Sequence, residues 1–285
     1  MNGRNEEYFA DNLKSWDAVA KMHAQGSGAD FYRIEEFLRG ECKLGPWEIG
    51  EAGPVDGKSL LHLQCHIGTD TLSWARYGAQ VTGLDFSTAA IGEAERFARL
   101  LRIQDARFVV STVSQAVNAL SGETFDIVYT GRGAICWLPD LDEWAGICAQ
   151  LVRPGGILYM EETHPTLDLM EVVELDNRKV IQPKFDPFRT DPISEVYEGS
   201  YADRSAKTGC HMNHCWEHGL GAVLNALVNQ GFEIELLNER AWAFFEPWED
   251  IFEPVIPNYW KLKDEFVPFP MSYTLRARRM TDRSD

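Results

Sequence analysis

The sequence predicts an α/β fold with a mostly parallel sheet, because apolar strands and helices alternate from residue 60 onward. Residues 60–63 form a short apolar run, as expected of a strand covered on both faces. A helix follows as far as Tyr77–Gly78, and residues 81–85 form a second buried strand that ends at Asp85. Ligands of parallel sheets bind beyond the carboxyl ends of the strands, where a lone carboxylate can accept hydrogen bonds from a ribose diol. These observations predict a nucleotide-type site at Asp85.

The other elements continue the same alternation along the chain. Two helices precede the sheet, over residues 5–24 and 31–38. Further helices are predicted over 88–103, 140–151 and 220–229, and further strands over 107–110, 125–130, 157–162, 232–237 and 272–277. The Pro154-Gly155-Gly156 segment predicts a tight turn into the strand at 157–162.

Composition excludes several classes of function. The chain has 285 residues and a net charge of −17, which repels phosphate backbones, so nucleic acid is not an expected partner. No apolar run approaches the ~18 residues that would span a bilayer, and the N-terminus lacks a signal-peptide pattern, so no membrane partner is expected. Six cysteines scattered over strands and loops are typical of reduced thiols, and a cytoplasmic location is expected.

The loop after the first strand indicates which kind of nucleotide the predicted site binds. A dinucleotide fingerprint needs three glycines, whereas here Gln64 and His66 occupy two of those positions and only Gly68 remains. The Lys-Ser/Thr pair of a P-loop is also absent. The loop resembles motif I of the class I S-adenosylmethionine (SAM)-dependent methyltransferases, in the Gln-Cys-His-x-Gly form of a small-molecule branch, with His62 in place of the usual acid. SAM carries no phosphate, so side chains are tolerated in this loop.

The second half of the sheet strengthens this resemblance. Phe125-Asp126-Ile127-Val128 is followed at moderate distance by Leu151-Val152-Arg153-Pro154-Gly155-Gly156, as in the family. The similarity covers roughly residues 58–164 and 219–279. It implies a Rossmann-like, seven-stranded, mostly parallel sheet with helices on both faces and an antiparallel last strand.

The resemblance also divides the chain into functional segments. Residues 1–57 are expected to form a helical lid, residues 58–164 the first part of the SAM-binding core, and residues 165–215 an insertion on the substrate side. Residues 216–285 complete the core and include an aromatic-rich cap at 241–268. The exposed insertions could equally serve as a homodimer contact.

Carried over position by position, the resemblance implies a set of cofactor-binding residues. Asp85 would bind the ribose hydroxyls with Phe86 beside the adenine, and Thr112 and Val113 would edge the adenine ring. The full set is Tyr32, Gln64, Cys65, His66, Gly68, Thr71, Asp85, Phe86, Ser87, Thr112, Val113, Thr130, Gly131 and Ile135.

The aromatic cap predicts an acceptor with sizeable apolar or aromatic surface. Packing of the insertion onto the core is the alternative role for these side chains. The candidate acceptor-binding residues are Tyr8, Trp16, Trp137, His214, Trp216 and Trp242.

A hydroxyl, ammonium or carbon-acid acceptor needs a base that takes its proton. His164 follows the fifth strand at the carboxyl edge of the sheet, and His218 opens the next helix. The carboxylate candidates are Glu161, Glu162 and Glu171. The Cys210–His218 segment holds two cysteines and three histidines, but its spacing is not that of a common zinc site. As an extended strand it would place these ligands on opposite faces, so no metal is expected.

The sequence thus predicts a methyltransferase (EC 2.1.1 class) that transfers the methyl group of SAM to an O, N or C atom of a small organic acceptor, with S-adenosylhomocysteine (SAH) as product. Specialised metabolism, such as natural product biosynthesis, is the expected setting. The alternatives are a non-catalytic SAM- or metabolite-binding protein, because motif I has drifted, and a nicotinamide-dependent oxidoreductase on a similar sheet.

Overall fold

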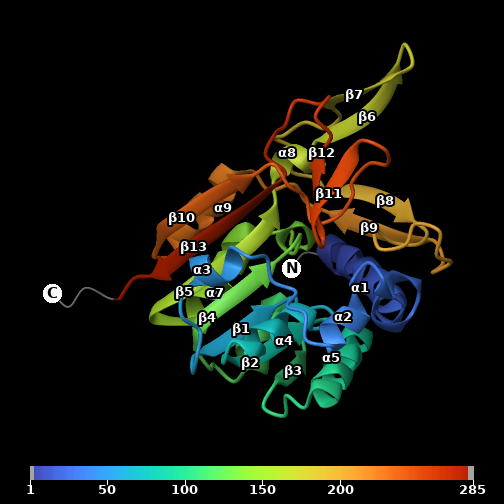
Figure 1. The fold of residues 1–285 in the computed structure, drawn as a ribbon. Helices are drawn as coiled ribbons and strands as arrows, with labels where there is room; N and C mark the ends of the chain where they lie inside the picture. Colours follow the sequence, from blue (N-terminus) through green and yellow to red (C-terminus); the bar gives the residue numbers. More distant parts are fainter. Residues whose placement is uncertain (1–2, 282–285) are drawn as a thin grey trace.

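A seven-stranded sheet forms the centre of the computed structural model, which describes residues 3–281 (Figure 1). Its strands are β1 (Ser59–Leu63), β2 (Gln80–Asp85), β3 (Arg107–Val110), β4 (Phe125–Gly131), β5 (Val152–Thr163), β10 (Phe232–Arg240) and β13 (Ser272–Arg279). They lie in the order β10-β13-β5-β4-β1-β2-β3, and β1 to β5 pair in parallel. Strand β13 is antiparallel to both of its neighbours. The predicted fold class is therefore confirmed, including the antiparallel last strand.

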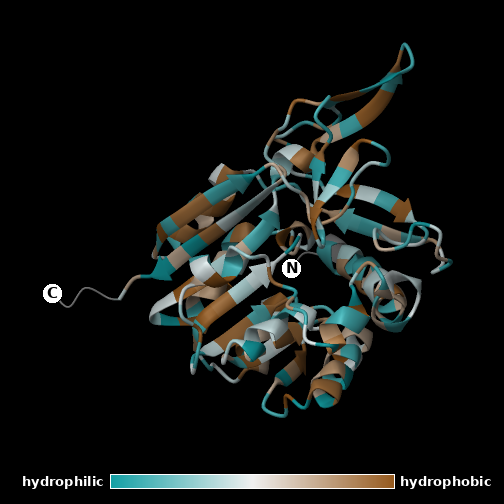
Figure 2. Ribbon diagram, in the orientation of Figure 1, coloured by the Kyte–Doolittle hydropathy of each residue, from teal (hydrophilic) through white to brown (hydrophobic). Residues whose placement is uncertain are grey.

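Helices cover both faces of this sheet. The main helices are α1 (Gly3–Gln25), α4 (Thr69–Arg76), α5 (Thr88–Leu101), α7 (Leu141–Leu151) and α9 (Leu220–Asn229), with the shorter α2 (Ile34–Leu38), α3 (Glu48–Ala52), α6 (Ala116–Ala119) and α8 (Pro165–Asp168). Single turns of 3₁₀ helix occur at Ser27–Ala29, Val113–Gln115 and Ile135–Trp137. Leu61 and Leu63 of β1 pack with α7 and α9, whereas Leu60 packs with Trp74 of α4 on the other face. Burial on both faces explains why apolar residues stand next to one another in β1 and β4, and Figure 2 shows brown stretches in the central strands.

The predicted helices and strands of the core match the structure to within a few residues. One detail is wrong: Pro154-Gly155-Gly156 does not precede the fifth strand as a turn, because β5 already begins at Val152. The segment instead shifts the register between β4 and β5, and Gly155 adopts a φ of 76° there.

Three two-stranded sheets lie beyond the carboxyl ends of the parallel strands, at the top of Figure 1. They pair β6 (Met170–Leu175) with β7 (Arg178–Pro183), β8 (Ile193–Tyr197) with β9 (His211–Cys215), and β11 (Phe252–Ile256) with β12 (Tyr259–Leu262). Of these strands, only the extended segment at 211–215 was considered from the sequence. No helix within residues 3–281 combines the length and apolar character required of a membrane-spanning segment.

Helix α1 closes the other side of this region by packing on β9. The Asn12 side chain donates to the carbonyl oxygen of His214 at 2.9 Å and accepts from the His214 backbone N–H at 2.8 Å. This paired contact joins the first helix to an insertion some 200 residues later in the chain.

Substitution of Gly68 tests the geometry at the start of α4. Gly68 has a φ of 76°, and an added Cβ would lie 2.6 Å from the Cβ of Ala94. Gly57 has a φ of 70° with open space around it, so Gly57→Ala measures backbone strain alone, about 1–2 kcal/mol. We expect Gly68→Ala to lower the free energy of unfolding by about 1–3 kcal/mol more than Gly57→Ala, as measured by urea denaturation. Equal losses would contradict the close packing of α4 on α5.

Candidate functional site

A cavity of about 510 Å³ lies at the carboxyl edge of the parallel strands, between the sheet, α1 and the three small sheets. We call the part beside the sheet the sheet-side lobe; its wall contains Gln64–Ile67, Asp85–Phe86, Ser111–Val113 and Gly131–Ala134. We call the part beneath the insertions the cap-side lobe; its wall contains Leu167–Asp168, Met170–Glu171, Lys184–Phe185, Glu195, Tyr197, Cys215, Glu217, Phe244–Phe245 and Trp248. The volume lies within the usual range for small-molecule sites.

Two residues of the loop after β1 have the left-handed backbone conformation that is usual for glycine, although neither is glycine. Gln64 has a φ of 56° and His66 a φ of 47°, both in the left-handed region. Each such residue costs roughly 1–2 kcal/mol, so surrounding contacts must hold the loop. The Gln64 side chain donates to the carbonyl oxygen of Ala134 at 2.8 Å and thereby ties the loop to the end of β4.

The Asp85 carboxylate holds the same loop from the side of β2. One oxygen accepts from the backbone N–H of His66 at 2.8 Å, and the other accepts from the backbone N–H of Ser87 at 2.9 Å. Asp85 is only 5% exposed, and this burial raises its pKa to about 6. Each carboxylate oxygen has a further lone pair, so a ligand in the cavity can still donate to it.

Neutral side chains connect this loop to the cap. Nδ1 of His23 and Nε2 of His66 lie 2.9 Å apart, and Nε2 of His23 lies 2.8 Å from the hydroxyl of Ser200. Burial lowers the pKa of His23 to about 3 and that of His66 well below its usual value, so both rings are neutral. The Tyr32 and Tyr201 hydroxyls are hydrogen bonded nearby. One chain of hydrogen bonds therefore joins α1, the loop after β1 and the insertion.

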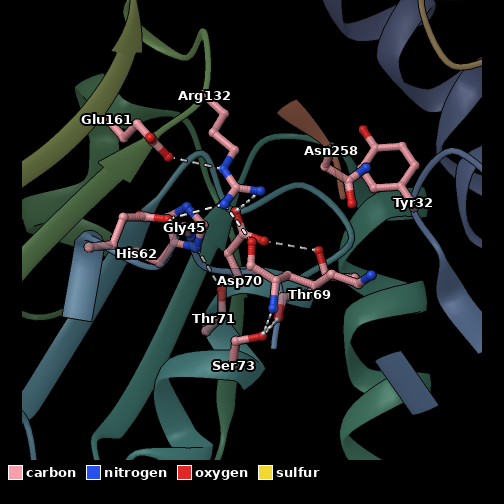
Figure 3. Close-up of polar contacts among 12 residues, drawn as sticks. Tyr32, Gly45, His62, Thr69, Asp70, Thr71, Ser73, Arg132, Glu161 and Asn258 are labelled. Carbon is pink, nitrogen blue, oxygen red and sulfur yellow. Dashed lines mark hydrogen bonds and ion pairs between the residues drawn. The ribbon is translucent and has the colours of Figure 1, made fainter. Parts of the chain in front are cut away.

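A buried arginine forms the other wall of the sheet-side lobe (Figure 3). The Arg132 guanidinium lies 3.1 Å from Glu48, 3.3 Å from Glu161 and 3.7 Å from Asp70. Glu161 also accepts from the Trp47 indole at 2.8 Å and from the Tyr259 hydroxyl at 2.9 Å. Burial, and then the charge of Glu161, raise the pKa of Glu48, while Gly45, Tyr129 and Arg132 all donate hydrogen bonds to its carboxyl oxygens.

Two carboxylates stand at the wall of the cap-side lobe. Asp168 ends α8, and Glu217 follows β9. Burial, then the charges of Glu217 and Glu162, raise the pKa of Asp168 well above its usual value. Burial raises the pKa of Glu217 to about 7, against a smaller opposite effect from Arg189.

Most of the predicted cofactor residues line this one cavity. Those in its wall are Tyr32, Gln64, Cys65, His66, Asp85, Phe86, Thr112, Val113 and Gly131. Those outside its wall are Gly68, Thr71, Ser87, Thr130 and Ile135. Thr71 bonds to the ring of His62 at 2.8 Å, and Ser87 caps α5, so these two side chains serve the local structure.

Of the predicted proton acceptors, Glu171 lines the cavity, whereas His164, His218, Glu161 and Glu162 do not. Nδ1 of His164 accepts from the backbone of Thr166 at 3.1 Å, and Nε2 lies 2.9 Å from Glu239, so both nitrogens are used. His218 lies 2.8 Å from the carbonyl oxygen of Leu138. Glu162 accepts from the backbone N–H groups of Ala134 and Ile135. His218 and Glu162 instead border a small neighbouring hollow, which shares only part of its wall with the cavity.

Only some of the residues that are predicted to bind the methyl acceptor line the cavity. Trp16 and Trp137 line the cavity and pack edge to face, with ring centroids 5.2 Å apart. Tyr8 of α1 packs on His214 and on Trp216, and Trp242 packs on Trp47. These four side chains do not line the cavity. Within residues 3–281, no group of three or more histidine, cysteine or acidic side chains is placed to hold a metal ion.

Sequence reasoning missed Arg132, Asp70, Asp168 and Glu217. The partners of Arg132 come from separate segments, and no spacing along the chain brings Glu48, Asp70 and Glu161 together. The one available signal was position: Arg132 directly follows a predicted strand, and residues at such ends face the ligand edge of a parallel sheet.

Replacement of Arg132 tests how strongly the buried charges depend on one another. Arg132→Met would leave Glu161 without its cationic partner, and we expect a loss of about 3–5 kcal/mol in the free energy of unfolding. The control is Arg107→Met, because Arg107 pairs with Glu123 at 2.6 Å with both side chains nearly half exposed, and such pairs contribute less than about 1 kcal/mol. Adding Glu161→Gln to Arg132→Met should recover part of the loss. Similar urea midpoints for the two arginine variants would be incompatible with a buried ion cluster.

Comparison with known proteins agrees with this architecture. Residues 61–158 match a family model described as a methyltransferase domain. The ubiquinone biosynthesis O-methyltransferase of Escherichia coli O7:K1 is 30% identical over 158 residues, which cover 54% of this chain and 64% of that protein. The enzyme of the same name from Rhizobium leguminosarum bv. trifolii is 34% identical over 117 residues, or 41% of this chain and 44% of the relative. The chain thus spans less than two thirds of the length of these curated relatives.

A solved structure shows the same fold over nearly the whole chain. An S-adenosylmethionine dependent methyltransferase from Mesorhizobium loti superposes with a TM-score of 0.55 at 19% identity, covering 85% of this chain and all of that one. The strand order, the matched domain and the loop after β1 agree with one another. Residues 61–158 thus match a methyltransferase domain, and the fold of the chain is that of S-adenosylmethionine-dependent methyltransferases.

Proposed function

We propose that this protein is a methyltransferase that binds SAM in the sheet-side lobe and methylates a small organic molecule in the cap-side lobe. The single observation that carries the proposal is Asp85, a carboxylate at the end of β2 that lines the cavity and keeps lone pairs free for a diol. The matched methyltransferase domain, residues 61–158, contains both Asp85 and the loop that it holds.

The residues around Asp85 fit the shape and chemistry of SAM. The carboxylate would accept from the ribose hydroxyls, with Phe86 and the Thr112–Val113 backbone beside the adenine. Gln64 and His66 carry side chains at positions where a dinucleotide-binding loop has glycine. SAM has no phosphate, so its binding allows these side chains. SAM supplies a methyl group on a positively charged sulfur. The chain itself has to align the two partners and exclude water, and such alignment can contribute about 7–11 kcal/mol to lowering the barrier.

Two features support a small acceptor: the wall of the cap-side lobe and the net charge of the chain. The insertions supply most of the wall of the cap-side lobe, and the net charge of the chain, −17, opposes nucleic acid. We place the acceptor in specialised metabolism and the protein in the cytoplasm; the six cysteines are unpaired, which agrees with a reducing compartment. The proton would pass to a carboxylate of the cap-side lobe, because His164 and His218 lie outside the wall.

Titration with SAH tests the cofactor site. We expect wild-type protein to bind SAH in calorimetry and Asp85→Ala to bind it at least about 100-fold more weakly, because two charge-assisted hydrogen bonds are lost. Asp85→Asn retains one acceptor oxygen and should fall between the two. Asp105→Ala, on the exposed loop before β3, is the control and should bind like wild type. Wild-type binding of NADH with no binding of SAH would favour the oxidoreductase, and SAH binding without turnover of any acceptor would favour a non-catalytic protein.

The pH dependence of SAH binding tests the state of Asp85. Its pKa of about 6 means that the free protein carries a proton on Asp85 below pH 6 and a carboxylate above it. Ribose hydroxyls need the carboxylate as acceptor, so affinity should be constant above about pH 7 and fall by up to about tenfold per pH unit below pH 6. Asp85→Asn should lack this dependence. An affinity that rises as pH falls would refute the assignment.

A further inference from the structure

We infer that the acceptor is an amine, and that Asp168 and Glu217 bind its ammonium group and remove its proton; this inference rests on the proposed methyltransferase function. Both carboxylates line the cap-side lobe. Asp168 lies at the end of α8, directly after β5, and Glu217 lies directly after β9. Two separate segments thus bring carboxylates to one wall.

These two carboxylates differ from the other acids of the lobe because the protein does not satisfy them. Glu171 accepts from Gln182 at 3.0 Å, and Glu195 pairs with Lys184 at 3.6 Å. Within residues 3–281, the carboxylate oxygens of Asp168 and Glu217 accept no hydrogen bond and form no ion pair.

Arg189 acts on Glu217 through its charge but forms no ion pair with it among the residues that the structure describes. Its guanidinium donates to the carbonyl oxygens of Asp191 at 2.9 Å and Pro192 at 3.0 Å. Partly buried carboxylates without partners are costly, and a bound cation is the group that would offset this cost.

The remaining wall indicates what the amine is attached to. Leu167, Met170, Phe185, Phe244, Phe245 and Trp248 line the same lobe. Aromatic faces tolerate a nearby cation as well as apolar groups. The ligand class is therefore a primary or secondary amine on an apolar or aromatic body. An anionic acceptor such as a carboxylate would meet the same charges and be repelled.

The reaction balances with the groups present. A carboxylate of the Asp168–Glu217 pair takes one proton from the bound ammonium, which frees the nitrogen lone pair. The lone pair then forms the new N–C bond to the methyl group while the C–S bond of the sulfonium breaks and its electron pair remains on sulfur. The products are the methylated ammonium, SAH and a protonated carboxyl group. A raised pKa for Glu217, about 7, suits a group that exchanges protons near neutral pH.

The test compares matched amines and alcohols on the SAH-loaded protein. The probes are 2-phenylethylamine with 2-phenylethanol, tryptamine with tryptophol, and 2-(1-naphthyl)ethylamine with 2-(1-naphthyl)ethanol, titrated by calorimetry with SAH in excess. We expect each amine to bind at least tenfold more tightly than its alcohol. We expect Glu217→Gln and Asp168→Asn each to weaken amine binding at least tenfold and to leave alcohol binding unchanged. Glu174→Gln, on the exposed part of β6, is the charge control and should change neither.

Thermal denaturation without ligand provides a second readout. Removing an unsatisfied carboxylate should raise or preserve the melting temperature, whereas a structural role for either residue would lower it. A lower melting temperature, an equal preference for alcohols, or tighter binding of alcohols would overturn the inference; the last result would indicate a hydroxyl acceptor. SAH titration of the same samples separates the two claims: absence of SAH binding refutes the proposed function, whereas SAH binding without amine preference refutes only the amine.

Discussion

The Asp85 carboxylate joins the two loops that form the floor of the cavity. It accepts from the backbone of His66 after β1 and of Ser87 after β2, while it is almost completely buried. The left-handed backbone at Gln64 and His66 is unfavourable for residues with side chains, so this carboxylate and the Gln64–Ala134 hydrogen bond must hold the loop in place. The same group that fixes the loop therefore also lines the cavity.

Two sets of contacts, one neutral and one charged, connect the loops at Asp85 to the rest of the cavity wall. On the side of α1 and the insertion, the His66–His23–Ser200 chain is neutral, because burial lowers the pKa values of both histidines. On the opposite side, Arg132 gathers Glu48, Glu161 and Asp70. The charged cluster sits against the sheet, and its members come from α3, α4, β5 and the end of β4. The neutral chain crosses to the cap, where bonds can break and re-form without exposing a buried charge.

The sequence was sufficient for those features that repeat along the chain. Apolar runs at 60–63, 81–85 and 125–130 alternate with helices, so the parallel sheet and the position of Asp85 at its edge could be predicted. The hairpin of β6 and β7 was missed, although Asp176 and Asn177 between its strands have φ values of 50° and 58° and such pairs are a hairpin signal. His164 follows β5 as expected, yet its ring turns to Glu239 and the backbone of Thr166. Contacts of this kind, and the meeting of Asp168 with Glu217, depend on how the insertions fold back and leave no pattern in the sequence.

The central claim is that the sheet-side lobe binds SAM through Asp85, and a crystal structure of the protein with SAH tests it most directly. We predict that the ribose hydroxyls lie within hydrogen-bond distance of the Asp85 carboxylate, the adenine between Phe86 and Thr112–Val113, and the sulfur toward the cap-side lobe. SAH bound elsewhere, or with its ribose away from Asp85, would contradict the account.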